Sequence, residues 1–202
     1  AQARALRLAD NQIALNSGWD EALLARMGEA IGREARANGV SMVLGPGLNI
    51  QRDPLCGRNF EYFSEDPLLS GRLAGAWVRG AQRTGTGACL KHFAANSQEY
   101  KRFSSDSVMD MRTLREIYLT GFELAVKQSR PASVMCSYNR LNGEHASDSR
   151  FLLTDILRRE WGFDGFVVTD WGALNDRTAA LKAGCDLNMP GGSRYQIRKA
   201  MR

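Results

Sequence analysis

The sequence has no long apolar run and no closely spaced pair of cysteines. None of its apolar segments approaches the roughly 20 residues that a membrane-spanning helix needs, so no membrane association is expected. The cysteines are Cys56, Cys89, Cys136 and Cys185. Without a CxxC pair a zinc site is not expected. Because three cysteines lie in or beside apolar stretches, free buried thiols are the expected state, although a disulfide between some pair stays open.

The sequence also lacks the marks of a secretory leader and of a nucleic-acid-binding protein. The first ten residues carry Arg4 and Arg7 but no apolar leader segment. The net charge of +5 comes from 27 Lys and Arg scattered among 22 Asp and Glu. There is no basic run of five and no nucleic-acid-binding motif. We therefore expect an ordinary mixed-charge surface, no nucleic-acid partner and one globular domain.

What the sequence does contain is a regular alternation of helical periodicity and short apolar runs. Helices are predicted at 20–36, 66–80, 110–128, 151–160 and about 176–183, and the final residues are predicted to begin another. Strands are predicted at 40–44, 88–90, 133–136, 165–169 and 185–189. Long loops at 49–65 and 137–148 separate some of them. This strand–helix repeat indicates a parallel sheet with right-handed crossovers.

Polar residues after the strands decide between a doubly wound sheet and a barrel. A dinucleotide-binding sheet would carry GxGxxG after its first strand, but the one GxG, at 85–87, precedes a strand. Several strands instead run into polar side chains: Lys91-His92, Ser137-Tyr138-Asn139, Asp170-Trp171 and Asn188. Barrel enzymes build their sites at these strand ends. The predicted fold is α/β, a (β/α)8 TIM-type barrel. Because five strands are found where a barrel has eight, the barrel is expected to be partial.

Asp170 directly follows the clearest strand, so its carboxylate should be held rigidly at the barrel mouth. Trp171 beside it offers a flat apolar wall, which suits the C–H face of a sugar ring. Position alone leaves a turn aspartate or a helix cap equally open.

Two further clusters carry hydrogen-bond donors. Lys91 and His92 follow an apolar strand, where a lysine is costly unless it is paired, and Arg102 comes soon after. A core histidine with a surface lysine is the alternative. Arg58 lies with Glu61 in the long loop 49–65, and long loops are often functional, although a loop arginine is commonly a solvated ion pair.

Four segments together resemble the family 3 glycoside hydrolases, in their β-glucosidase branch. They are GPGLNIQRDPLCGRNFEYFSEDP (Gly45–Pro67), LKHFAANSQE (Leu90–Glu99), SVMCSYNRLNGE (Ser133–Glu144) and GFDGFVVTDWGA (Gly162–Ala173). Their order and spacing match that family's barrel domain. The resemblance covers nearly the whole chain.

The resemblance implies retaining hydrolysis of terminal non-reducing β-D-glucosyl residues, with no metal and no cofactor. Asp170 matches the nucleophile. Positions that hydrogen-bond the sugar are matched by Arg58, Lys91, His92 and Arg102, and positions lining the same subsite by Met135, Tyr138 and Trp171. Since the nucleophile must be ionised, cationic groups on Lys91, His92 or Arg58 are expected beside it. The partner would be a β-glucoside or a short β-linked oligosaccharide.

Motifs that differ between branches of the family favour a β-glucosidase. The segment KHFAANSQE argues against the β-N-acetylglucosaminidase branch, which usually carries KHFPGHG, and Trp171 favours a glucosidase over a xylosidase, which often has cysteine there. A β-xylosidase or other β-glycosidase of the family stays an alternative, as does a non-catalytic sugar-binding barrel. Asn188 stands where the family usually has an acidic residue.

The resemblance also implies that residues 1–202 are part of the catalytic barrel. The family's DGPxGxR segment, with a sugar-binding aspartate, would precede residue 1. Its general acid/base glutamate would come from a second α/β domain that follows the barrel. Within the chain, Glu99, Asp106, Asp148 and Asp176 are candidates for that role by residue type only. Related proteins are often periplasmic or secreted; the oligomeric state is not indicated.

Overall fold

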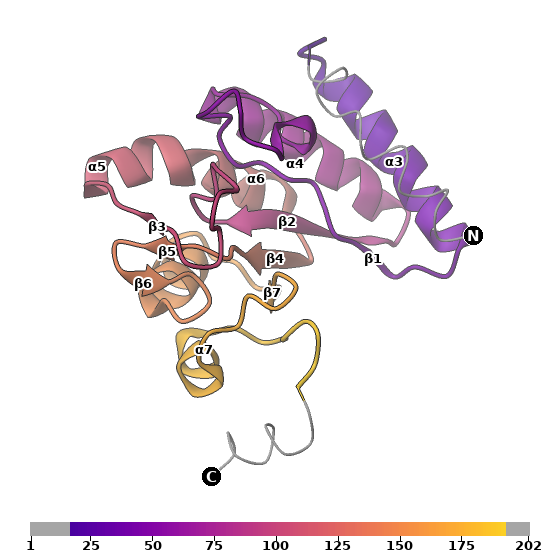
Figure 1. The fold of residues 1–202 in the computed structure, drawn as a ribbon. Coiled ribbons are helices and arrows are strands. Elements are labelled where there is room, and N and C mark those ends of the chain that lie inside the picture. The colour runs from indigo at the N-terminus through magenta and orange to yellow at the C-terminus, as the bar shows by residue number, and fades with distance from the viewer. Residues whose placement is uncertain (1–16, 193–202) are drawn as a thin grey trace.

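The computed structural model describes residues 17–192, so the helix predicted at the end of the chain lies outside the described residues. Its main sheet contains four parallel strands in the order β1-β2-β4-β7 (Figure 1). They are β1 (Met42–Val43), β2 (Gly87–Phe93), β4 (Ser133–Cys136) and β7 (Phe166–Thr169). These strands succeed one another in chain order without a reversal, as in a barrel and unlike a doubly wound sheet.

One strand prediction, at 88–90, was too short, since β2 runs from Gly87 to Phe93, and two others were too long. The strand predicted at 40–44 is paired only over β1, and Val40 and Leu44 on either side are exposed. The strand predicted at 185–189 is reduced to a single bridge between Val168 and Leu187. There the Asp186 carboxylate accepts a hydrogen bond from the Val167 N–H at 2.7 Å, so a side chain takes the place of a ladder bond.

The predicted helices are present, and four of them begin after an aspartate that caps the first turn. They are α3 (Glu21–Ala37), α4 (Pro67–Arg83), the run α5 (Met111–Thr113), η3 (Leu114–Leu119) and α6 (Thr120–Ser129), η4 (Phe151–Glu160) and α7 (Arg177–Ala183). Carboxylates of Asp20, Asp66, Asp110 and Asp176 accept hydrogen bonds from first-turn N–H groups. Both η3 and η4 are wider π-type turns. No helix in the described part is both long and apolar enough to cross a membrane.

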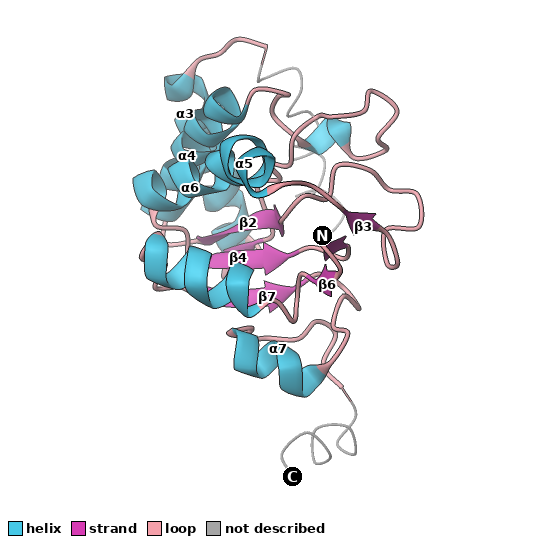
Figure 2. Ribbon diagram, turned by 90° about the vertical axis from the view of Figure 1, so that its left-hand side faces the viewer, coloured by secondary structure: helices cyan, strands magenta, loops and turns pink. Residues whose placement is uncertain are grey.

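The sheet separates two apolar layers because side chains alternate along a strand. On one face, Leu90, Val134 and Val167 pack against the helices in a large core. On the other, Cys89, Met135 and Val168 form a small cluster with Met42, Phe166 and Met189. Figure 2 shows α3, α4 and α6 together on one side of the sheet. The small cluster therefore marks the face that becomes the interior of a barrel.

A second, small sheet lies beyond the carboxyl ends of the main strands (Figure 2). It joins β3 (Asp106–Ser107), β5 (Arg140–Leu141) and β6 (Glu144–His145) in the order β3-β5-β6. The sequence did not predict it, because two-residue strands are too short to show a period. This sheet ties the loop after β2 to the loop after β4.

Candidate active site

The polar residues at the carboxyl ends of β2, β4 and β7 meet at one edge of the sheet. Asp170 extends β7 by one more bond, since its N–H donates to the carbonyl of Cys136 at 3.2 Å. Next to it, the ladder between β2 and β4 passes from Lys91↔Met135 to Phe93↔Cys136 and leaves His92 as an extra, bulged residue. Such bulges re-aim side chains and are frequent beside active sites.

The two oxygens of the Asp170 carboxylate differ in their hydrogen bonding. Oδ1 accepts a hydrogen bond from the Trp171 N–H at 2.6 Å. Oδ2 lies 3.5 Å from His92 Nε2 and 3.7 Å from Arg58 Nη1, and it has no hydrogen-bond partner within the described residues. With its side chain 14% exposed, Asp170 presents a fixed carboxylate whose second oxygen is buried and accepts no hydrogen bond within the described residues.

His92 is buried and held from three directions. Asn49 accepts a hydrogen bond from the His92 N–H at 2.7 Å and donates to its carbonyl at 2.8 Å. The Tyr62 hydroxyl lies 3.1 Å from Nδ1. Burial, and then the positive charges of Arg58, Lys91 and Arg102, lower the pKa of His92 well below 6.5. The imidazole is therefore neutral, which corrects the expectation that it could be a cation beside Asp170.

Tyr62 indicates the tautomer of that imidazole. Burial raises the pKa of the Tyr62 phenol well above its ordinary value, so the hydroxyl keeps its proton and can donate to Nδ1. The N–H of His92 would then lie on Nε2, which faces Asp170.

Lys91 does not pair with Asp170 as expected. Its Nζ lies 3.0 Å from Glu61 Oε2, while Arg58 Nε donates to Glu61 Oε1 at 2.5 Å. Burial alone would raise the pKa of Glu61, but the charges of Lys91 and Arg58 together lower it. Of the three expected cations, Arg58 is the charged group beside Asp170, because His92 is neutral and Lys91 pairs with Glu61.

Tyr138 and Arg102 form the opposite side of the site. The Tyr138 hydroxyl donates to the Trp171 carbonyl at 3.0 Å, and burial and the negative charge of Asp170 raise its pKa to about 12. The Arg102 guanidinium lies 4.3 Å from the centre of the Tyr138 ring, and its Nη1 pairs with Glu99 at 2.6 Å. Arg102 thus reaches the Asp170 neighbourhood through Tyr138.

The two remaining predicted residues have contrasting surroundings. The Trp171 side chain is 64% exposed beside Asp170, as a wall for a ligand requires. Met135 is buried with Cys89 and Val168 on the interior face, as the register partner of Lys91.

Three residues of the site were missed: Asn49, Glu61 and Tyr62. Glu61 and Tyr62 lie in the loop cluster that the sequence singled out, and the spacing of three between Arg58 and Glu61 was the available signal. The link from Asn49 to His92 spans 43 residues, and no local pattern reports such a contact.

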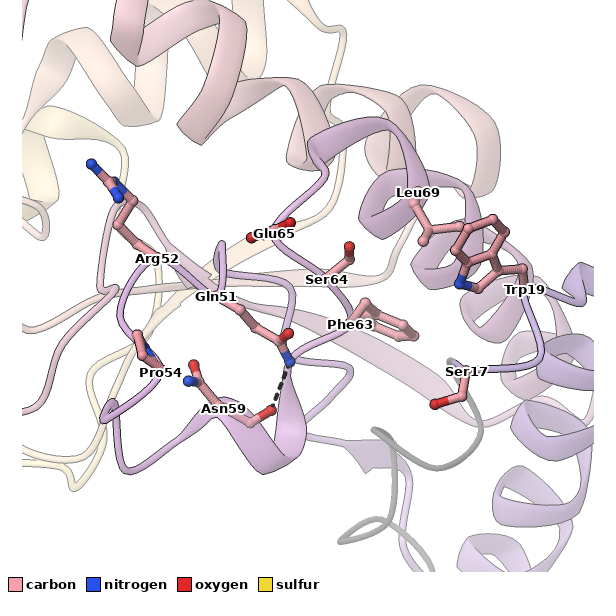
Figure 3. Close-up of a pocket in the computed structure, with 10 residues that line it drawn as sticks. All are labelled: Ser17, Trp19, Gln51, Arg52, Pro54, Asn59, Phe63, Ser64, Glu65 and Leu69. Carbon is pink, nitrogen blue, oxygen red and sulfur yellow. Dashed lines mark hydrogen bonds between the residues drawn. The ribbon is translucent and has the colours of Figure 1, made fainter.

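A separate hollow lies between the start of α3 and the loop 51–65 (Figure 3). Trp19 and Gln51 help to line it, and Gln51 Nε2 donates to the Asn59 carbonyl at 3.1 Å. None of the predicted site residues lines this hollow.

All four cysteines are buried and free, as predicted. Burial raises the pKa of Cys89 to about 12. Cys89 is therefore a packing group.

A parallel sheet of this order, with its polar cluster at the carboxyl ends of the strands, is the arrangement of barrel enzymes. The family described as "Glycosyl hydrolase family 3 N terminal domain" matches residues 3–202. The chain belongs to this family, which confirms the predicted resemblance.

Similar proteins and solved structures support the same family. The "Thermostable beta-glucosidase B" of Acetivibrio thermocellus is 60% identical over 176 residues, covering 87% of this chain and 23% of that protein. The "Exo-alpha-(1->6)-L-arabinopyranosidase" of Bifidobacterium longum is 52% identical over 176 residues, with the same 87% and 23% coverage.

Beta-glucosidase 3B from Thermotoga neapolitana, solved in complex with alpha-D-glucose, superposes with a TM-score of 0.89 at 53% identity, over 93% of this chain and 26% of that one. The (β/α)8 barrel class is thereby confirmed. The chain spans about a quarter of the length of these relatives.

Proposed function

We propose that the protein carrying this chain is a retaining β-glucosidase that removes terminal non-reducing β-D-glucosyl residues, with Asp170 as its nucleophile. The observation that carries the proposal is the Asp170 carboxylate, with Oδ1 anchored by the Trp171 N–H and Oδ2 lacking a hydrogen bond within the described residues. A nucleophile needs this combination of fixed position and available lone pair. The names of the β-glucosidase relatives support the choice of sugar.

The reaction would proceed in two displacements. Asp170 Oδ2 forms a bond to the anomeric carbon while the glycosidic C–O bond breaks, and the leaving oxygen takes a proton from a general acid. Water, deprotonated by the same group, then attacks the anomeric carbon and releases the Asp170 carboxylate. Two inversions restore the β configuration in the product.

The general acid/base is proposed to come from a second domain of the full-length protein. Four carboxyl groups in the chain were candidates by residue type, and each of them accepts a hydrogen bond from another residue. Glu99 pairs with Arg102, Asp106 accepts from the Gly143 N–H, and Asp176 caps α7. The fourth, Asp148, accepts a hydrogen bond from Asn175 at 2.7 Å.

The remaining side chains are proposed to bind the sugar. Donors on Arg58, Lys91, His92 and Arg102 would bond its hydroxyl groups, with Trp171 as an apolar wall, and Met135 and Tyr138 would bound the subsite. His92, being neutral, would donate through Nε2–H without adding charge.

The test uses the protein expressed over the full length of its gene. With an aryl β-D-glucoside, proton NMR of the first product should show β-glucose. Asp170→Ala should abolish turnover, and azide should rescue it by forming the α-glycosyl azide. A β-configured azide, or an Asp170→Ala variant as fast as the parent, would show that another residue is the nucleophile.

The second candidate is an α-L-arabinopyranosidase, favoured by the 52% identity to relatives of that name. Comparing kcat/KM on aryl β-D-glucoside, β-D-xyloside and α-L-arabinopyranoside separates these specificities. A preference of more than about tenfold for the arabinopyranoside, which corresponds to about 1.4 kcal/mol, would replace the glucoside in the proposal.

A further inference from the structure

Glu61 is a largely buried carboxylate in the site that the proposed reaction does not use. It is 12% exposed, and both of its oxygens are engaged, Oε1 by Arg58 and Oε2 by Lys91. It ends a short 3₁₀ turn, η2 (Asn59–Glu61), which directly follows Arg58. Side chains three residues apart eclipse in such a turn, so the backbone itself sets Glu61 over Arg58.

The turn is pinned to the loop beneath it. Gln51 Nε2 donates to the carbonyls of Asn59 and Tyr62, at 3.1 and 3.0 Å. Because these bonds fix the backbone on both sides of Glu61, its carboxylate is a rigid acceptor for the two longer, more flexible basic side chains.

Arg58 therefore lies between two carboxylates at unequal distances. Its Nε is 2.5 Å from Glu61, whereas its Nη1 is 3.7 Å from Asp170. A guanidinium with a single neighbouring carboxylate forms a close, two-pronged pair with it. If Glu61 lost its charge, Asp170 would be the remaining partner, and its free oxygen would be bonded to Arg58.

We propose that Glu61 is a positioning residue that holds Arg58 and Lys91 as donors toward the sugar and keeps Arg58 from closing on Asp170. The inference rests on the proposed function, because it assumes that Asp170 is the nucleophile. Glu61 is not a second acid: both of its oxygens accept charged donors, and the charges of Lys91 and Arg58 outweigh burial to lower its pKa.

The experiment compares Glu61→Gln with the parent in the full-length protein. The amide keeps one acceptor for Arg58, removes the charge and turns a donor toward Lys91. We expect kcat/KM on an aryl β-D-glucoside to fall by about 100-fold, the loss that a misplacement of about 1 Å produces, with kcat carrying most of it. The rate constant for trapping Asp170 with an activated 2-deoxy-2-fluoro-β-glucoside should fall by a similar factor, since it reports the first displacement alone.

Two further variants make the result decisive. Glu160→Gln removes a carboxylate from a surface pair with Arg115, at 2.6 Å, and should leave kcat, KM and the trapping constant unchanged. Glu61→Asp keeps the charge, but its shorter side chain can contact only one of the two basic side chains. It should therefore recover part of the lost kcat/KM. Active-site titration counts competent molecules, which separates slower chemistry from a smaller folded fraction.

Each outcome bears on one of the two proposals. A parent that neither turns over nor is trapped contradicts the proposed function. A parent that is trapped, with Glu61→Gln trapped at the same rate per competent site, overturns only the role of Glu61. If Glu61→Gln does not fold, Glu61→Asp decides: a reduced trapping constant supports the role, and a parental one refutes it.

Discussion

Two glycines of α4 should respond to alanine in opposite directions, although they lie only five positions apart. A Cβ on Gly80 would lie 1.9 Å from the carbonyl oxygen of Ala25 in α3, where ordinary contacts begin at 3.4 Å. A Cβ on Gly75 would lie 3.3 Å from Gln128 Oε1, the end of a flexible side chain. Helix α4 therefore touches the backbone of α3 at Gly80, whereas at Gly75 it faces the side chain of Gln128 in α6.

The magnitude follows from two opposing effects. Alanine gains about 1 kcal/mol over glycine in a helix interior. At Gly80, however, α3 must move by more than 1 Å, and overpacking of this kind costs about 1–3 kcal/mol or more. We expect Gly80→Ala to destabilise the barrel domain by about 1–2 kcal/mol and Gly75→Ala to stabilise it by about 0.5–1 kcal/mol.

Scanning calorimetry of the full-length protein measures both. A domain of this size changes its Tm by about 2–4 °C per kcal/mol. Gly80→Ala should therefore lower the barrel's Tm by about 2–8 °C, and Gly75→Ala should raise it by about 1–4 °C. If Gly80→Ala melted at or above Gly75→Ala, the close packing of α3 on α4 would be wrong.

Three further predictions concern titrating groups. Because the pKa of Tyr138 is raised to about 12, its hydroxyl stays a donor, and Tyr138→Phe should lower kcat/KM by about 2- to 12-fold without moving the alkaline limb of the rate–pH profile; a moved limb would contradict this. The pKa of His92 lies well below 6.5, so below that pH the unfolded chain binds a proton that the folded chain does not. Stability should then fall with decreasing pH by up to about 1.4 kcal/mol per unit, and His92→Gln should flatten the decline of Tm; an unchanged slope would count against a neutral His92. Iodoacetamide followed by peptide mass spectrometry should label Cys56, Cys89, Cys136 and Cys185 only after unfolding, and rapid labelling of native Cys89 would refute its burial.

Helix starts and central strands could be predicted from the sequence because their causes are local. Asp66 caps α4 with Pro67 at its first position, and both residues are adjacent to what they control. The strand at 133–136 was bounded correctly because it is apolar and paired on both sides, to β2 and to β7. The lengths of the strands at the two sides of the described sheet were overestimated. A local sequence shows that a segment tends to be extended, but it does not show whether a neighbouring strand is present to pair with it.

The residues of the site also differ in whether a local sequence signal identifies them. Asp170 could be identified because it follows β7, and Lys91 and His92 because they lie at the carboxyl end of β2. Parallel strands bring their carboxyl ends together. The pairing of Lys91 with Glu61 could not be identified, because it depends on how loop 49–65 folds over the sheet. The sequence therefore indicated which side chains gather at the site, and the structure shows which of them bond to one another.

The charges at the site explain why Arg58 and Lys91 need a second carboxylate such as Glu61. Arg58 and Lys91 are two cations in a half-buried cluster, where an unpaired charge is costly. Asp170 alone would balance one of them, and its second oxygen would then be engaged by that cation and not free for the proposed nucleophilic attack. With Glu61 present, two cations face two carboxylates, and the neutral His92 adds no charge. Arg102 is balanced separately by Glu99. A neutral ligand such as a sugar can then displace water from the cluster without leaving a net charge buried beneath it. With the same two cations and only one carboxylate, a net positive charge would be buried.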